Sequence, residues 1–293
     1  MQRLAEHDWR AREAAHAERI DAMTAEYLAW RRRGDRHPVL DFLFDYYGHT
    51  PGKLRRWHPG PGVLLEGAAH TERAEWAHMR VEGDGVILDG VSFAAARATG
   101  IAFARRILAR TLERPIQTGC FGLHEWAMVY RGTADRRHGS WPLRLAPEAT
   151  DAVIDEGTLR CTHFDATRFF TPEALPRNEL SPTRDTQEDF EQPGCLHAGM
   201  DLYRWALKLA PGLPSDLTAD AFSLACEIRE LDMRASPYDL SALGYEPVCI
   251  ETADGRRDYA ERQRAFGERG NALRRRMLPA VEALAAQGEL ATA

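Results

Sequence analysis

The stretch PGCLHAGMDLYRWALKL, residues 193–209, decides the fold, because its apolar and polar side chains both follow a helical period. The apolar stripe consists of Leu196, Met200, Tyr203 and Leu207. The polar stripe consists of His197, Asp201, Arg204 and Lys208. His197 and Asp201 are therefore expected one turn apart on the same side of an amphipathic helix.

Helical patterns extend on both sides of this stretch. Residues 1–35 are rich in Ala, Glu and Arg and poor in helix breakers, which predicts an N-terminal helix. Residues 92–113 form an apolar helical pattern. Another helix is expected from Ser215 to about Arg234, and a charged helix covers residues 255–287.

Strand patterns occupy a smaller part of the chain. VLLEG, residues 63–67, reads as a short strand, and residues 78–90 read as two strands joined by a Gly-Asp-Gly turn. Residues 171–193 are rich in Pro, Thr and Asp and predict an irregular loop. The expected fold is α+β: a mostly helical single domain over residues 1–293 with a small antiparallel sheet.

Composition restricts the class of protein. With 44% hydrophobic and 28% charged residues, the 293-residue chain has the balance of an ordinary globular protein. No run approaches the roughly 20 apolar residues that span a bilayer, and the first residues lack an apolar signal segment. These features predict a cytoplasmic protein without a membrane partner, whose five cysteines are reduced. They leave the oligomeric state open.

The net charge of −6 predicts an average surface that repels nucleic acid. Short basic clusters are present all the same, and folding could gather them along a phosphate path. They are Arg31 to Arg33, Arg55 with Arg56, Arg136 with Arg137, and Arg274 to Arg276. Solvated charged faces are the alternative interpretation.

Three segments place a Cys close to a His and an acid: GCFGLHE at 119–125, RCTHFD at 160–165 and GCLHAGMD at 194–201. Thiolate, imidazole and carboxylate are the usual ligands of zinc and suit iron as well. Residues 150–165 are also expected to form a hairpin, whose second arm places Cys161, His163 and Asp165 on one face.

We expect one Zn or Fe ion, because a catalytic site needs only three protein ligands gathered from distant segments. The preferred ligands are His124, His163 and His197, with Cys161 and Cys195 as further donors. Asp165, Asp201 or Glu125 would serve as carboxylate ligand or as its hydrogen-bonding support. Simple packing of buried thiols is the alternative, and Cys195 activated by His197 as a nucleophile is another.

A second acidic pattern lies on the helix predicted after Ser215. It consists of Glu227, Glu230 and Asp232 with Arg229 and Arg234. Metal ligation, orientation of a ligand and a buried ion network all remain open for it.

Six long strings carry a resemblance that covers the chain from about residue 5 to about residue 280. They are HPVLDFLFDYY, LRRWHPG, GCFGLHEWAMVYR, HFDATRFFTP, EQPGCLHAGMDLYRWALKL and ELDMRASPYDLSALGYEPVCIET. The sequence resembles a bacterial family, common in actinobacteria, that is labelled 3-methyladenine DNA glycosylase. The helix-hairpin-helix motif of many glycosylases is absent from it. The resemblance implies a hydrolase that acts in DNA repair and releases an alkylated base from damaged DNA.

An alkylated adenine is a cationic leaving group, so its excision needs an electron-rich pocket and a carboxylate. Glu125, Asp201 and Asp165 are the candidate catalytic acids. The candidate substrate-binding residues are Trp126, Tyr130, Tyr203, Trp205 and Arg234. The alternative function is a metal-dependent enzyme on a small molecule or peptide. A noncatalytic binding protein is the third possibility.

Overall fold

The structure is a computed structural model that describes residues 1–132 and 139–290. The predicted basic pair Arg136 and Arg137 lies outside the described residues. The chain divides into two compact units. Unit 1 comprises residues 1–109, 202–223 and 272–293, and unit 2 comprises residues 110–201 and 224–271.

Unit 1 holds most of the N-terminal elements. In chain order they are β1 (Gln2–Leu4), α1 (Glu6–Arg32), α2 (Phe42–Tyr47), α3 (Pro51–Leu54), β2 (Val63–Leu65), the 3-10 turns η1 (Ala68–His70) and η2 (Glu72–Glu75), β3 (Met79–Glu82) and β4 (Gly85–Leu88). Four longer helices each contribute residues to both units: α4 (Gly90–Glu113), α9 (Leu196–Leu209), α10 (Ser215–Arg234) and α11 (Ala253–Leu290).

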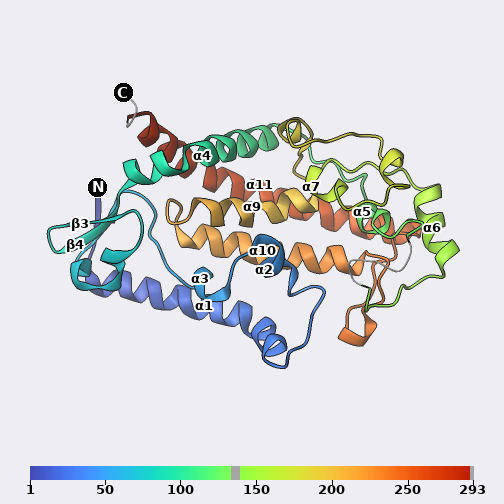
Figure 1. The fold of residues 1–293 in the computed structure, drawn as a ribbon, viewed down its shortest axis with the longest axis horizontal. Helices are drawn as coiled ribbons and strands as arrows, with labels where there is room; N and C mark the ends of the chain where they lie inside the picture. The colour runs from blue at the N-terminus through green and yellow to red at the C-terminus, as the bar shows by residue number, and fades with distance from the viewer. Residues whose placement is uncertain (133–138, 291–293) are drawn as a thin grey trace. The chain divides into compact units, whose positions relative to one another are not determined.

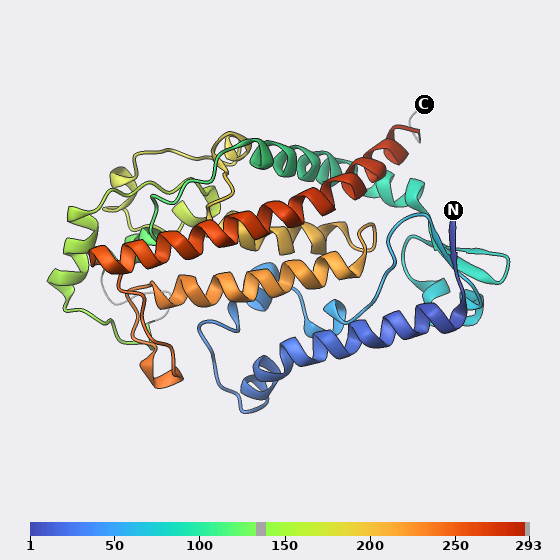
Figure 2. The ribbon, with the colours of Figure 1, turned by 180° about the vertical axis from the view of Figure 1, so that it is seen from behind.

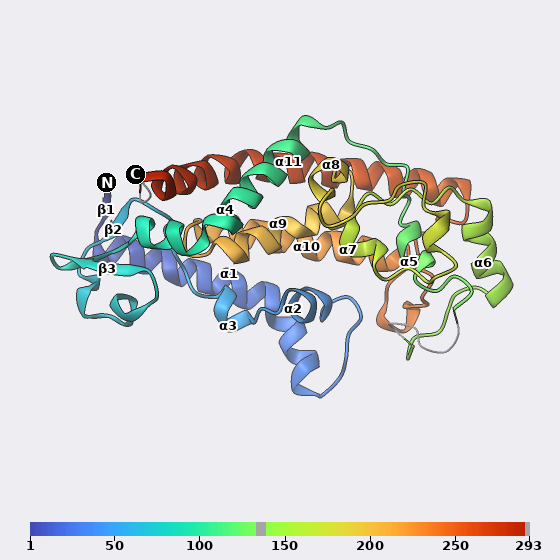
Figure 3. The same cartoon turned by 45° about the horizontal axis from the view of Figure 1, so that its top comes forward.

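The sheet of unit 1 has the strand order β1-β2-β4-β3 and lies beside the N-terminal end of α1 (Figures 1 and 3). β3 and β4 form the predicted hairpin, with Val81 opposite Val86. β1 runs parallel to β2, with Arg3 opposite Leu64. Trp9 on α1 is 1% exposed and packs on the sheet in one apolar cluster with Leu4, Trp57, Leu65, Ala68 and Val86.

Unit 2 holds short helices between irregular segments. They are α5 (Leu123–Ala127), α6 (Pro147–Glu156), α7 (Phe164–Thr167), η3 (Leu175–Arg177), α8 (Gln187–Phe190) and η4 (Ser241–Leu243). The unit 2 segments of α10 and α11 lie alongside each other (Figure 2), and an ion pair of 2.6 Å between Arg269 and Glu227 joins them. These helices supply the frame on which the polar site of this unit is built.

The predicted fold class is confirmed: the described chain is mostly helical with a small sheet. The sheet is mixed rather than purely antiparallel, because β1 runs parallel to β2. The residues of β1 were predicted as helix. The predicted helix within 1–35 is α1, and the predicted helix 255–287 is α11. The loop 171–193 contains the short helices η3 and α8. A single domain over residues 1–293 stays a prediction.

The hairpin expected over residues 150–165 is wrong. Residues Pro147–Glu156 form α6, with Pro147 in its first turn, where a missing N–H costs nothing. Thr150 and Ile154 are buried one turn apart, which is a helical and not an alternating pattern. His163 therefore does not lie on a strand, and it directly precedes α7.

Within the residues that the structure describes, no helix combines the length and the apolar character needed to cross a membrane.

Candidate metal centre

Six histidine and carboxylate side chains from distant parts of the sequence meet inside unit 2. His124 lies on α5, His163 directly precedes α7, Glu191 directly follows α8, His197 and Asp201 lie on the first turns of α9, and Asp232 lies on α10. They form two groups of three, and in each group the possible ligand atoms all lie within 4.8 Å of one another. Buried groups of this composition could hold a metal ion.

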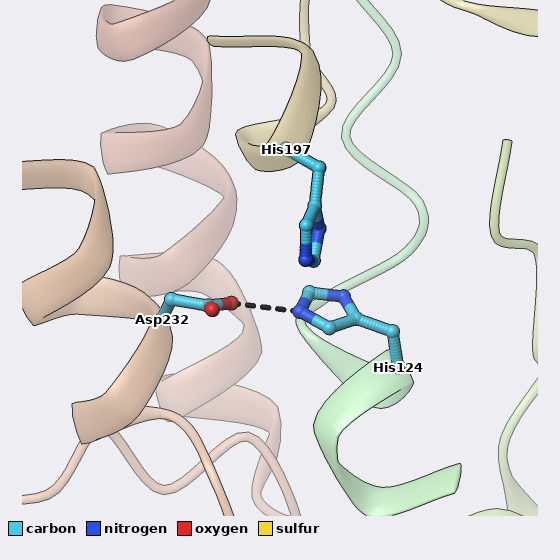
Figure 4. Close-up of side chains that lie close together, drawn as sticks. All are labelled: His124, His197 and Asp232. Atoms are coloured by element: carbon cyan, nitrogen blue, oxygen red, sulfur yellow. Dashed lines mark hydrogen bonds and ion pairs between the residues drawn. The ribbon is translucent and has the colours of Figure 1, made fainter. Parts of the chain in front are cut away.

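The first group, called the His124 group, comprises His124, His197 and Asp232 (Figure 4). Nε2 of His124 is 2.7 Å from Oδ1 of Asp232, which is a hydrogen-bond distance. The ring of His197 stands over the ring of His124, with centroids 4.5 Å apart and planes inclined by 75°. Two imidazoles and one carboxylate are the donor set of many non-haem iron and zinc sites.

The second group, called the His163 group, comprises His163, Glu191 and Asp201. Nε2 of His163 is 3.4 Å from Oδ2 of Asp201. His163 is 1% exposed, and neither of its ring nitrogens has a hydrogen-bond partner among the described residues. Buried polar atoms without hydrogen-bond partners are uncommon in folded proteins, so the two ring nitrogens of His163 are candidates for binding a ligand.

His197 joins the two groups. Its ring stacks on that of His163, with centroids 5.1 Å apart and an interplanar angle of 23°. His197 belongs to the His124 group, while Asp201, one turn later on α9, belongs to the His163 group. All six side chains are buried as members of these groups.

A buried arginine orders the Asp232 carboxylate of the His124 group and the neighbouring Glu125 carboxylate. Nη1 of Arg229 donates to Oε1 of Glu125 at 3.0 Å and to Oδ2 of Asp232 at 2.8 Å. Arg229 is only 1% exposed, so these charge-assisted bonds are made away from water. With one oxygen of Asp232 on Arg229, the other is directed at His124.

The three imidazoles have different charge preferences. Burial alone would lower the pKa of His124, but the adjoining Asp232 carboxylate outweighs burial and raises that pKa above its ordinary value. The pKa of His163 is raised in the same way by Asp201. Burial, reinforced by His124 and His163, holds the pKa of His197 well below its ordinary value. The surroundings therefore favour the neutral form of the central ring and the protonated form of the two flanking rings.

Asp232 has the opposite balance. Burial opposes its charged form, but His124 and Arg229 more than offset that cost and lower its pKa. The carboxylate is thus held ionised, which is the form that ligates a metal.

Side-chain amides fix the loops that carry the ligands. Asn178 accepts from the backbone N–H of Cys161 at 2.7 Å and donates to its carbonyl at 3.0 Å, which sets the segment leading to His163. Gln187 donates to Oε2 of Glu191 at 3.1 Å.

Gly122 forms the turn that precedes α5 and positions His124. Its φ is 74°, and a β-carbon there would lie 3.1 Å from the Tyr259 hydroxyl, so glycine suits this turn.

The predicted catalytic acids have separate positions. Asp201 lies in the His163 group. Glu125 pairs with Arg229, and Asp165 pairs with Arg168 at 3.1 Å, so neither belongs to the two groups. The prediction that histidines 124, 163 and 197 converge agrees with the observed ring contacts.

Cys161 and Cys195, predicted as further ligands, are not members of either group. Burial raises the pKa of the Cys161 thiol to about 12 and that of Cys195 well above its ordinary value. Such thiols stay protonated, which disfavours Cys195 as a nucleophile.

The aromatic candidates make ordinary structural contacts. Trp126 is fully buried and donates from Nε1 to the Ala235 carbonyl at 2.8 Å. Tyr130 donates to Oδ1 of Asp155 at 2.7 Å. Arg234 donates to the Glu246 carbonyl at 2.8 Å and to Glu230 at 3.1 Å.

Tyr203 and Trp205 belong to unit 1, whereas Trp126 and Tyr130 belong to unit 2. Tyr203 contacts Tyr47 and Phe222 at centroid distances of 5.6 and 5.1 Å. Trp205 contacts Phe103 at 5.4 Å. A base-binding pocket formed by these four residues stays a prediction.

Sequence reasoning missed Glu191 as a ligand and named Asp232 only as part of an acidic helix face. Glu191 lies in the acidic loop before α9 and carries no periodic signal of its own. The chain matches no protein-family model, and comparisons with curated proteins and with solved structures likewise give no match.

Proposed function

We propose that this protein is a metal-dependent enzyme that acts on a small molecule, with its ion held by His163, Glu191 and Asp201. The supporting observation is the geometry around His163. This imidazole is buried, both of its nitrogens lack hydrogen bonds among the described residues, and two carboxylates adjoin it.

The His163–Asp201 distance fits two ligands of one ion. At 3.4 Å the contact is long for a hydrogen bond between a ring nitrogen and a carboxylate. Two ligands of a tetrahedral ion with bonds of about 2.1 Å lie roughly 3.4 Å apart. The two side chains are therefore spaced for an ion between them.

The donor set favours iron within the expected choice of zinc or iron. Two carboxylates and one imidazole are mostly hard oxygen ligands, whereas structural zinc sites use thiolates and imidazoles in closed tetrahedra. Three protein ligands leave positions for water or substrate. The ion would supply Lewis acidity to a substrate that binds there.

The burial of the centre restricts the substrate. His163, Glu191 and Asp201 are each at most 2% exposed. A folded peptide or a duplex does not reach such a site without rearrangement, so we propose a small molecule or a single protruding group as the substrate. The basic clusters add little to the case for nucleic acid, since Arg31, Arg33, Arg55 and Arg276 each pair with a carboxylate.

Metal analysis tests the proposal directly. The full chain is stripped with chelator, incubated anaerobically with Fe²⁺, Mn²⁺ or Zn²⁺ singly, desalted and assayed for bound metal by mass spectrometry. We expect stoichiometric retention of at least one of these ions and its loss in Asp201→Asn and Glu191→Gln. Glu251→Gln is the matched control, because Glu251 is a half-buried carboxylate of the same unit that pairs with Arg144 at 2.7 Å.

Retention of none of the three ions by the folded wild type would overturn the proposal. The glycosylase activity that the resemblance implies stays a prediction, and release of alkylated base from methylated DNA by the same preparations would test it separately.

A further inference from the structure

We infer that the His124 group is a second metal site, so that the two groups form one dinuclear centre. This inference rests on the proposed function, because it adds a second ion beside the one assigned to the His163 group. The geometry that supports it lies in the His124 group and in α9.

The His124 group has the donors and the spacing for an ion of its own. His124 and His197 offer imidazole nitrogens, and Asp232 offers Oδ1, all within 4.8 Å of one another. The ring of His197 contacts those of His124 and His163, at centroid distances of 4.5 and 5.1 Å, which places its nitrogens beside both groups.

The hydrogen bond between His124 and Asp232 keeps their two donor atoms close to the spacing that an ion would require. Nε2 and Oδ1 are 2.7 Å apart with a proton between them. Adjacent ligands of a six-coordinate ion with bonds of about 2.1 Å lie roughly 3.0 Å apart. A few tenths of an ångström of separation and the loss of the shared proton therefore convert the pair into two ligands.

Arg229 prepares Asp232 for this role. Its Nη1 holds Oδ2 at 2.8 Å and leaves Oδ1 directed at His124. Hydrogen bonds from a fixed partner to the non-ligating oxygen are the usual support of a metal-binding carboxylate.

α9 places the two ions next to each other. It gives His197 to one group and Asp201 to the other, and side chains four residues apart on a helix have β-carbons about 5–6 Å apart. The rings of His163 and His197, one from each group, are stacked 5.1 Å apart. In two-metal enzymes the ions lie about 3.5–4 Å apart, and we propose a comparable separation here.

A dinuclear centre narrows the reaction class. Two adjacent ions can hold one substrate oxygen between them and stabilise charge on the attacking and leaving groups together. A compact substrate with an anionic or strongly polar oxygen, such as a phosphoryl or carboxylate group, is the ligand chemistry that fits.

Manganese is the probe for the test. The full chain is loaded anaerobically with excess Mn²⁺ and desalted, bound metal is counted by mass spectrometry, and paramagnetic resonance spectra are recorded. The wild type and the Glu251→Gln control should retain two ions per chain and show the spectrum of a spin-coupled pair. Asp232→Asn and His124→Gln should each retain one ion and show an uncoupled spectrum.

The outcomes separate the two proposals. One ion in the wild type, unchanged by Asp232→Asn and lost with Asp201→Asn, would refute the second site and leave the proposed function intact. No retained ion would refute both. Should Asp232→Asn fail to fold, the wild-type spectrum decides, because an uncoupled signal from the loaded wild type contradicts a dinuclear centre.

Discussion

Replacing Arg229 by methionine should destabilise the apoprotein strongly. Arg229 is 1% exposed and its Nη1 contacts both Glu125 and Asp232, at 3.0 and 2.8 Å. Methionine fills much of the same volume but leaves both carboxylates without this cation. Breaking a buried ion pair by removing one partner usually costs about 3–5 kcal/mol.

The distances around Arg229 give a similar magnitude for the loss of stability. Because both carboxylates contact one nitrogen, their nearest oxygens lie at most roughly 6 Å apart, and at an effective dielectric of about 20 two such charges repel by about 3 kcal/mol. His124 stays beside Asp232, so Glu125 is the carboxylate left uncompensated. Adding Glu125→Gln to Arg229→Met should therefore recover most of the loss.

Urea unfolding followed by circular dichroism, with chelator present, measures these free energies. Arg269→Met is the control, since its ion pair with Glu227 is about half exposed and should contribute at most about 1 kcal/mol. A cost of Arg229→Met no larger than that of the control would refute the reasoning. The reasoning would also be refuted if Glu125→Gln changed the free energy of unfolding equally in the wild type and in Arg229→Met.

Four further substitutions are predicted to change stability. Burial, with Arg73 and Arg56, lowers the pKa of His58 to about 3, below its unfolded value. The unfolded chain thus binds the proton first, and stability present above pH ~6.5 is lost as pH falls, by about 2 kcal/mol at pH 5. His58→Gln should remove that part of the pH dependence in urea titrations, and an unchanged slope would contradict it. Gly100→Ala should stabilise by about 0.5–1 kcal/mol, because Gly100 lies inside α4 with open space around it. Gly255→Ala should cost roughly 2 kcal/mol, since the Cys249 carbonyl fills the position of a β-carbon, and the two melting temperatures should move in opposite directions. Trp126→Phe should cost about 1–3 kcal/mol by leaving the buried Ala235 carbonyl without its donor, and a neutral result would show that this hydrogen bond contributes nothing to stability.

Strong helical periods made most of the fold predictable. The stripe of Leu196, Met200 and Tyr203 lies on α9 as expected, and all three side chains are buried. The Gly-Asp-Gly turn likewise joins β3 to β4. The signals that failed were local and short. β1 has three residues and takes its stability from pairing with β2, which is distant in sequence.

The α6 error shows a conflict between two signals. Val153 and Ile154 are β-branched, which favours a strand, and the pair Glu156 and Gly157 that follows favours a turn. Pro147 in the first turn and the buried pair one turn apart favour a helix, and the helix forms.

The candidate centre was predictable only in part. The Cys-His-acid segments located His124, His163, His197 and Asp201, because those residue types are uncommon together and recur. Glu191 could not be distinguished from the other acids of its loop. The convergence itself depends on contacts such as His124 with Asp232, which are 108 positions apart and leave no periodic trace in the sequence.

The order of the six side chains along the chain has a consequence for assembly. His163, Glu191 and Asp201 are all present before Asp232 has been synthesised. During translation, the nascent chain therefore contains all three residues of the His163 group before the His124 group is complete. Because α10 and α11 frame the site and follow these residues in the chain, the proposed centre is expected to acquire its ions only after both helices have been synthesised.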